Sequence, residues 1–208
     1  MYNASPSVCD CACGADFLRG VEVYRETVLE VVGDKPQKVE WPGYGFFIEI
    51  PEGAVPPGVT VSVGVKVILA GQFKFPENRQ LISAIYWVSS SIEFIKEVSV
   101  NIQHCAVVRS EDQCSQFKFI IAKCSQSQLP YKFREREGLF SSHTQYGAIK
   151  LKQFSLLGET APEDTDTLCT AFMFYQQQMP SPLTVDFHFV IVQDLEPNLQ
   201  VCVHVVLF

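Results

Sequence analysis

The chain has 208 residues, which is enough for one complete domain and part of a second. Apolar residues make up 47% and charged residues 19%, a composition that favours a packed core over a disordered chain. Lysine and arginine number 16 against 23 aspartates and glutamates, so the formal charge is -7. Because nucleic-acid binding needs cations that neutralise phosphates, this balance argues against a nucleic-acid partner.

No segment of the sequence is typical of a membrane span or a signal peptide. The longest uncharged run, residues 167–185, contains three glutamines and two prolines that a membrane helix would have to bury in lipid. Residues 1–16 lack the basic and continuous apolar regions of a leader. We therefore expect a cytoplasmic chain with no transmembrane segment, the alternative being the cytoplasmic region of a longer single-pass receptor.

The eight cysteines are too irregularly spaced for a disulfide scaffold, so reduced thiols are expected. Two groups of candidate metal ligands occur: Cys9, Cys11 and Cys13, and then His104, Cys105, Cys114 and Cys124. The first group lacks the fourth ligand and the C-x2-C spacing that are usual in a closed zinc site. Cys105 has apolar neighbours and is expected to be buried as a small hydrophobic residue. The sequence predicts no metal site and no cofactor.

From Trp41 onward the apolar residues alternate with period two and are rich in β-branched and aromatic types, which indicates half-buried strands. The expected strands are 47–50, 59–69, 81–88, 92–102, 116–123 and 148–157. Strand 59–69 should bury its odd-numbered face and expose the other. Residues 21–32 fit a helix or a strand equally well. The prediction is an all-β chain, a β-sandwich of mostly antiparallel strands followed by the first strands of a second β domain.

The acidic stretch 158–167 carries Glu159, Glu163, Asp164 and Asp166, and is expected to be a solvated linker. Beyond it, strands are expected at 168–175, 185–192 and 201–208. The last of these runs apolar to Phe208, so we expect a second domain that is cut short. The predicted organisation is an unassigned segment 1–30, a sandwich 31–157, an acidic linker 158–167 and a partial second domain 168–208.

Two separated stretches resemble a known family. Residues 45–58 read GFFIEIPEGAVPPG, and residues 91–106 read SIEFIKEVSVNIQHCA. Both are similar to signatures of the ZU-five domain of zonula occludens scaffolds, uncoordinated-type netrin receptors and ankyrins. The resemblance covers residues 31–157, although Ala84, Glu97 and Gln103 stand where that family commonly has proline. Residues 171–174, 185–192 and 194–195 resemble the start of the UPA domain that follows the ZU-five domain in netrin receptors and death-domain proteins.

This resemblance implies a protein–protein interaction module of an intracellular signalling or scaffold protein, and not a conventional enzyme. The implied partner is a protein: a death domain in the same chain, or a cytoskeletal or signalling protein. The residues themselves name no partner.

Some members of the family cleave their own backbone before the serine of a Phe-Ser pair, and Phe154-Ser155 stands at the matching place. That chemistry needs a base to take the proton of the Ser155 hydroxyl as it attacks the Phe154 carbonyl. Processing members often have histidine where this chain has Gln153, which is no base near neutral pH. His143 can serve only if the fold brings it near. The competing interpretation is that Phe154 packs in the core.

Two further features favour structural roles. His188 and His204 lie in apolar strands, where a lone histidine is more often structural than a ligand. The cations Lys132, Arg134 and Arg136 alternate with Phe133, Glu135 and Glu137. This pattern fits a solvated hairpin better than a docking ridge for an acidic partner, because the glutamates cancel most of the field.

Overall fold

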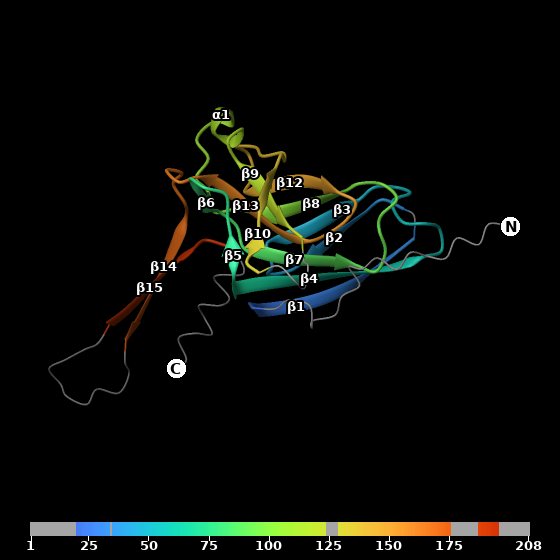
Figure 1. Cartoon of the computed structure of the whole chain (residues 1–208), viewed down its shortest axis with the longest axis horizontal. Helices are drawn as coiled ribbons and strands as arrows, with labels where there is room; N and C mark the ends of the chain where they lie inside the picture. Colours follow the sequence, from blue (N-terminus) through green and yellow to red (C-terminus); the bar gives the residue numbers. More distant parts are fainter. Residues whose placement is uncertain (1–19, 34, 124–128, 176–186, 196–208) are drawn as a thin grey trace.

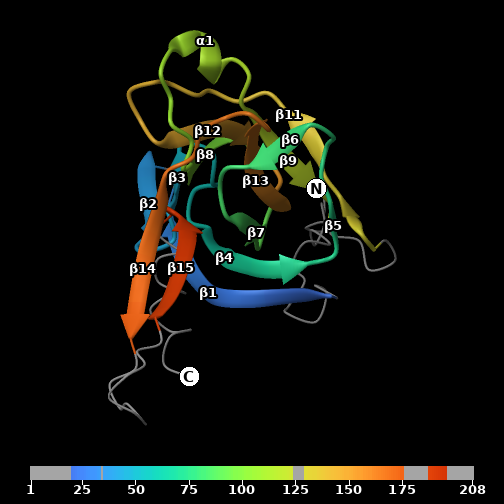
Figure 2. The same ribbon diagram turned by 90° about the vertical axis from the view of Figure 1, so that its left-hand side faces the viewer.

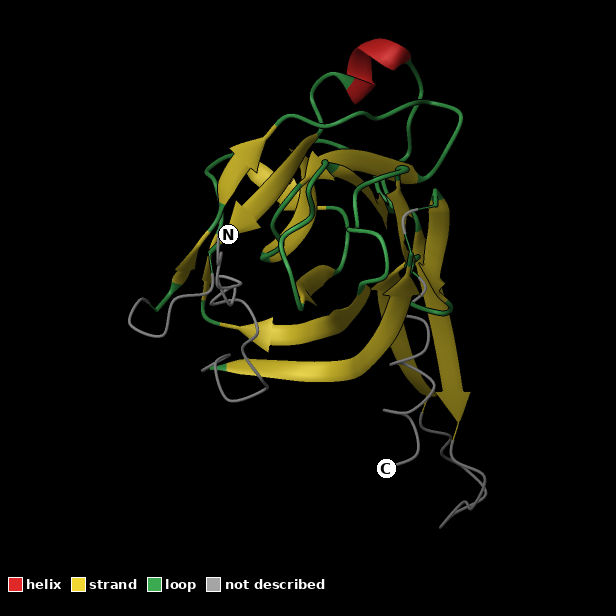
Figure 3. Cartoon of the chain, turned by 90° about the vertical axis from the view of Figure 1, so that its right-hand side faces the viewer, coloured by secondary structure: helices red, strands yellow, loops and turns green. Residues whose placement is uncertain are grey.

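The computed structural model describes residues 20–33, 35–123, 129–175 and 187–195, and in these ranges the regular secondary structure is almost entirely β-strand (Figure 3). The strands are β1 (Val21–Val32), β2 (Gln37–Trp41), β3 (Phe46–Ile50), β4 (Thr60–Gly71), β5 (Phe73–Lys74), β6 (Arg79–Leu81), β7 (Ile85–Ser90), β8 (Val98–Gln103), β9 (Lys118–Ala122), β10 (Tyr131–Lys132), β11 (Arg134–Arg136), β12 (Tyr146–Leu151), β13 (Leu156–Pro162), β14 (Cys169–Tyr175) and β15 (Phe187–Gln193). The single helix among the described residues is α1 (Glu111–Cys114). No described helix is long and apolar enough to cross a membrane.

Two sheets pack face to face (Figure 1). The larger has the strand order β1-β4-β7-β13-β9-β11, with β6 also paired to β13, and the smaller has the order β12-β8-β3-β2. All pairs in both sheets are antiparallel, and only the short β5–β10 pair is parallel among the described strands. The predicted all-β sandwich of mostly antiparallel strands is confirmed.

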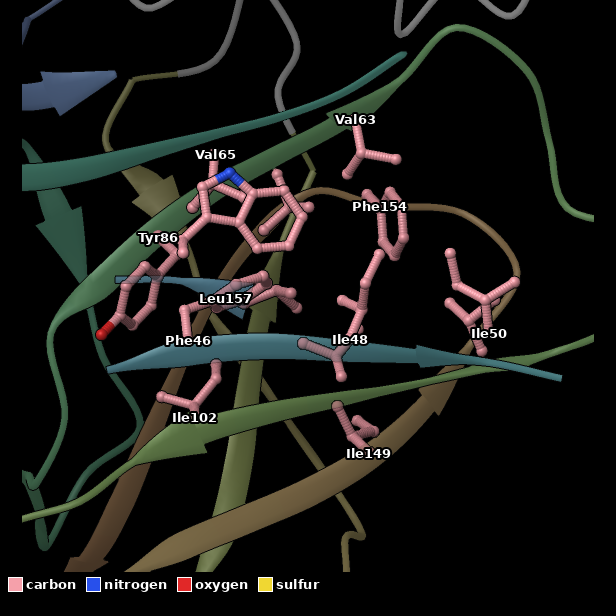
Figure 4. Packing of buried hydrophobic residues seen from close by; sticks show 14 of the residues in the cluster. Phe46, Ile48, Ile50, Val63, Val65, Tyr86, Ile102, Ile149, Phe154 and Leu157 are labelled. Atoms are coloured by element: carbon pink, nitrogen blue, oxygen red, sulfur yellow. The ribbon is translucent and has the colours of Figure 1, made fainter. Parts of the chain in front are cut away.

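The core between the sheets is made by alternate residues of the central strands. Ile48 and Ile50 of β3 face Val63 and Val65 of β4, and Phe154 points between them (Figure 4). Burying each such side chain contributes about 1.5–3 kcal/mol. The period-two pattern in the sequence therefore corresponds to real burial, since it places every second side chain in this layer.

Strand β4 differs from the prediction in being buried on both faces over much of its length. Lys66 and Ile68, expected on the solvent face, are 1% and 6% exposed. A second apolar cluster covers that face, and the Lys66 ammonium lies 4.9 Å from the centre of the Trp87 ring and 3.0 Å from the Glu26 carboxylate. A lysine in the pattern suggests solvent, but its stem packs on the sheet and its charge is paired.

The sandwich begins earlier than predicted. Residues 21–32 form β1, which pairs along its length with β4, so the sheet starts at Val21 and the helical alternative is wrong. The expected strand 148–157 is two strands, β12 and β13, which lie in different sheets. The apolar residues change phase at the bend, from Ile149 and Leu151 to Phe154 and Leu156, and the polar pair 152–153 marks the crossing.

The expected solvated linker 158–167 is largely part of the sandwich. Its first residues belong to β13, which lies between β7 and β9, and Glu159 is fully buried there. Only Glu163, Asp164 and Asp166 of its acidic residues are exposed. The strands expected at 168–175 and 185–192 are present as β14 and β15, a hairpin that leaves the sandwich (Figure 2). Residues 201–208 lie outside the described ranges.

A tight turn joins β2 to β3 and depends on Gly45. The Tyr44 N–H donates to the Trp41 carbonyl at 3.1 Å, and the Gly45 carbonyl accepts from the Gln103 N–H at 2.9 Å. Gly45 has φ +61°, and a Cβ atom there would lie 2.6 Å from Oε1 of Gln103. Glycine is needed twice over, for its backbone angle and for the close approach of β8.

We expect Gly45→Ala to lower the free energy of unfolding by about 2–3 kcal/mol, because it adds a steric conflict to a left-handed backbone. Gly58→Ala is the matched control: its φ is +74°, but nothing lies within 4 Å of the added Cβ, so only the backbone cost of about 1 kcal/mol applies. Urea unfolding of both variants measures the difference. Equal losses would show that the contact with Gln103 has no energetic weight.

Candidate functional site

The two sheets end together along one edge of the sandwich, where β11 is the last strand of the larger sheet and β12 the last strand of the smaller one. A groove of about 1460 Å³ opens at this edge and is lined by residues of both strands. Residues 152–155, through which the chain passes from β12 to β13, also line it. The volume exceeds the range of typical small-molecule sites, and it suits a peptide segment better.

Apolar side chains line much of the groove. Ile149 and Phe154 are each 6% exposed, whereas Leu139 is 71% exposed. Leu139 is held at the edge by two hydrogen bonds, since its N–H donates to the Ala148 carbonyl and the Ala148 N–H donates to its carbonyl, both at 2.8 Å. Leu139 is thus a fixed, exposed apolar side chain on a groove in which Ile149 and Phe154 are buried.

Charged side chains surround this apolar surface. The groove is lined by the cations Lys123, Arg136, Lys150 and Lys152 and by the carboxylates Glu93, Glu97, Glu135 and Glu137. Two of the carboxylates pair with cations that do not line the groove: Glu135 with Arg79 at 3.2 Å, and Glu137 with Lys118 at 2.8 Å. None of the four lining cations forms an ion pair with a described residue. Glu93 and Glu97 also form no ion pair with a described residue, so the four lining cations face two unpaired carboxylates, a local excess of two positive charges on a chain of net charge -7.

The Phe154-Ser155 pair lies in the segment that lines the groove. The Phe154 ring is turned into the core, where its centre lies 5.6 Å from that of Phe94 in an edge-on arrangement. The Ser155 carbonyl accepts from the Val88 N–H at 3.1 Å, and the Ser155 hydroxyl is 3.4 Å from the Leu156 carbonyl. The side chain of Phe154 therefore has a clear packing role, and the Ser155 hydroxyl is directed to a carbonyl oxygen.

His143 lies at the other end of β12 from Ser155. Its loop is fixed against α1, because the Glu111 carboxylate accepts a hydrogen bond from the Ser142 N–H at 3.0 Å. The Ser142 hydroxyl also donates to this carboxylate, and this bond, followed by the one from the Ser142 N–H, holds the pKa of Glu111 below its usual value. The six residues of β12 separate the two sites by roughly 17 Å. The structure therefore does not bring His143 to Ser155, and Gln153 at the family's histidine position is exposed.

Two ionisable side chains are buried between the sheets near β12. Glu159 has no donor in hydrogen-bonding geometry to either carboxylate oxygen. A Cβ atom at Gly147 of β12 would lie only 2.3 Å from its Oε1. Burial raises the pKa of Glu159 well above its usual value, and the backbone of Gly147 offsets this only in part. Burial therefore favours the neutral form of this carboxyl group in the folded chain.

His104 is the second of these groups. It is fully buried, neither ring nitrogen has a hydrogen-bond partner, and its ring lies 5.8 Å from Phe117 and 6.2 Å from Phe140. Burial lowers its pKa to about 4, although the backbone at Ala106 acts in the opposite direction. An imidazole in this state is neutral and is packed as an aromatic side chain.

The cysteines and the remaining candidates have separate places. Cys105 is buried, and burial raises its thiol pKa to about 12, so it is no reactive nucleophile. In the described ranges no three metal-ligating side chains gather to hold an ion, and Cys9, Cys11, Cys13, Cys124 and His204 lie outside those ranges. His188 is in β15. The expected hairpin 132–137 is instead two short strands, β10 and β11, that pair with different neighbours.

No protein-family model matches the chain, and no curated protein is recognisably similar to it. The resemblance of residues 45–58 and 91–106 to the ZU-five signature therefore stays a prediction.

We expect the Phe154–Ser155 bond to stay intact, because Phe154 is anchored in the core and His143 is remote. Denaturing mass spectrometry of the purified chain should give one species at full mass, with Ser155→Ala differing only by the lost oxygen. Fragments that end at Phe154 in the unsubstituted chain and are absent from Ser155→Ala would establish self-cleavage.

The two buried groups predict how stability depends on pH. Because the pKa of Glu159 is raised by folding, its full contribution to folding stability is present below about pH 4.5. That contribution is lost as the pH rises, since the carboxyl group ionises more readily in the unfolded chain. The lowered pKa of His104 means that stability falls as the pH drops from 6.5 towards 4. We therefore expect a stability maximum between about pH 4.5 and 6.5.

Glu159→Gln should raise the melting temperature at pH 8 by about 3 °C or more, and should change it less at pH 5, because it removes the alkaline loss only. The control is Glu49→Gln, whose side chain is exposed on the outer face of the smaller sheet. Calorimetry at the two pH values measures both. A Glu159→Gln effect that is the same at pH 5 and pH 8 would contradict a buried neutral carboxyl.

Proposed function

We propose that the chain is a non-enzymatic protein–protein interaction module of an intracellular signalling or scaffold protein, similar to the ZU-five regions of netrin receptors and death-domain adaptors. The observation that carries this proposal is the groove between β11 and β12, which combines an exposed leucine, an apolar lining and unpaired cations. An apolar centre with a polar rim is the usual anatomy of a protein interface.

The partner is a protein, either a death domain in the same chain or a cytoskeletal or signalling protein. Exposed sheet edges are common sites of protein recognition, because an added strand completes their hydrogen bonds. A cytoplasmic location, or the cytoplasmic side of the plasma membrane within a longer receptor, fits the free thiols of Cys105, Cys114 and Cys169.

The second candidate function is self-processing between Phe154 and Ser155. The position of this pair favours self-processing, since it lies in the groove where the chain passes from one sheet to the other. The anchoring of Phe154 and the distance to His143 make the binding function the better supported of the two.

A photo-crosslinking residue tests the interaction function directly. We expect a chain with benzoylphenylalanine in place of Leu139 to form ultraviolet-dependent adducts with another protein in cells, because this residue is exposed and lines the groove. The matched control is the same substitution at Val28, a 55% exposed residue of β1.

Adducts at Leu139 that are absent at Val28 support an interaction module that uses the groove. Adducts at Val28 alone would support an interaction module whose binding surface is on β1 and not at the groove. The absence of adducts at both positions would contradict the proposed function.

A further inference from the structure

The outward edge of β12 has a vacant place for a strand. The main chain of Ala148 points away from β8, because its N–H and carbonyl both bond Leu139. Backbone groups in an antiparallel strand point the same way at every second residue, so those of Lys150 also point outward. They have no partner among the described residues.

This edge is open because the residues before Leu139 turn away from β12 and join the other sheet. Leu139 pairs with Ala148 in antiparallel orientation, so a continued strand would run from Leu139 back towards residue 137 opposite Lys150. The residues before Leu139 instead form β11, which pairs with β9 of the other sheet. The single bridge between Leu139 and Ala148 is thus a strand pairing that stops after one residue. An extended peptide can continue it.

The side chains around this place define the chemistry of such a peptide. Leu139 offers an exposed apolar contact with the buried Ile149 behind it, and Lys150 and Lys152 carry charges without carboxylate partners in the described chain. Successive residues of a strand point to opposite sides. A peptide in which acidic and apolar residues alternate can therefore direct carboxylates to the cationic rim and apolar side chains to the lining.

We propose that the groove binds an extended acidic segment of a partner protein, which adds as a strand to the outward edge of β12 beside Lys150. This inference rests on the proposed interaction function and specifies the partner's local chemistry and its mode of binding. Main-chain pairing supplies orientation, and charge complementarity selects acidic over basic segments.

The probe is a fluorescein-labelled eight-residue peptide in which glutamates alternate with valine and threonine. Fluorescence anisotropy at low salt should show saturable binding to the full chain. Its lysine-for-glutamate counterpart should bind at least about tenfold more weakly, because the rim is cationic. An acidic peptide N-methylated at alternate residues should lose binding by a similar factor, because it cannot complete the strand pairing.

Two sets of variants separate charge from main-chain pairing. Lys150→Glu with Lys152→Glu should weaken binding about tenfold or more, whereas Lys74→Glu with Lys132→Glu, an equal charge change on exposed residues of β5 and β10, should change it less than about twofold. Lys150→Pro should bind more weakly than Lys150→Ala, because proline removes the outward N–H without removing a β12–β8 bond. The melting temperature of each variant shows that the fold is retained.

Equal binding of the acidic and basic peptides, undiminished binding of the N-methylated peptide, or no binding at all would overturn the proposal. The absence of peptide binding combined with adducts at Leu139 would leave the interaction function standing and remove only the acidic strand. If neither peptide binding nor adducts at Leu139 are found, both the acidic-strand proposal and the interaction function are contradicted.

Discussion

The passage of the chain from β12 to β13 is the constraint on which the groove depends. Consecutive antiparallel strands commonly pair with each other, but here they lie in different sheets. Phe154 fixes the crossing, since its ring is buried against Phe94 between the sheets. The bend leaves β12 at the edge of its sheet, with one side paired to β8 and the other largely open. The exposed edge is therefore a consequence of core packing.

The two stretches that resemble the ZU-five signature are neighbours in space, and their residues have structural roles. Phe46 pairs with Ile102 across β3 and β8. After β3, the Ile95 N–H donates to the Ala54 carbonyl at 2.9 Å, and the Lys96 ammonium donates to the Glu52 carbonyl at 2.6 Å. Such a lysine orders a proline- and glycine-rich loop by satisfying its carbonyl groups. The motif residues thus build the frame of the sandwich, and the groove residues lie mostly outside them.

Much of the fold was predictable from period-two alternation, because burial between sheets imposes that period. The position of Glu159 was not: an acidic residue among other acidic residues indicates solvent, and only the packing of β13 reveals its burial. Of the site, the Phe154-Ser155 pair was found through a motif. Leu139 and Lys150 were missed, because their importance comes from the pairing of two strands that the sequence does not show to be neighbours.

Strand β12 links the buried acid to the groove. At Gly147 its backbone lies against the buried carboxyl group of Glu159, and three residues later its outward edge faces the groove at Lys150. Movement of β12 away from the core removes the burial that raises the pKa of Glu159, so it favours ionisation of this carboxyl group. Re-burial must reverse that ionisation, so the edge strand is held less firmly as the pH rises. A partner that pairs with β12 in its packed position therefore favours the protonated carboxyl, and proton uptake and strand binding are linked through the same strand.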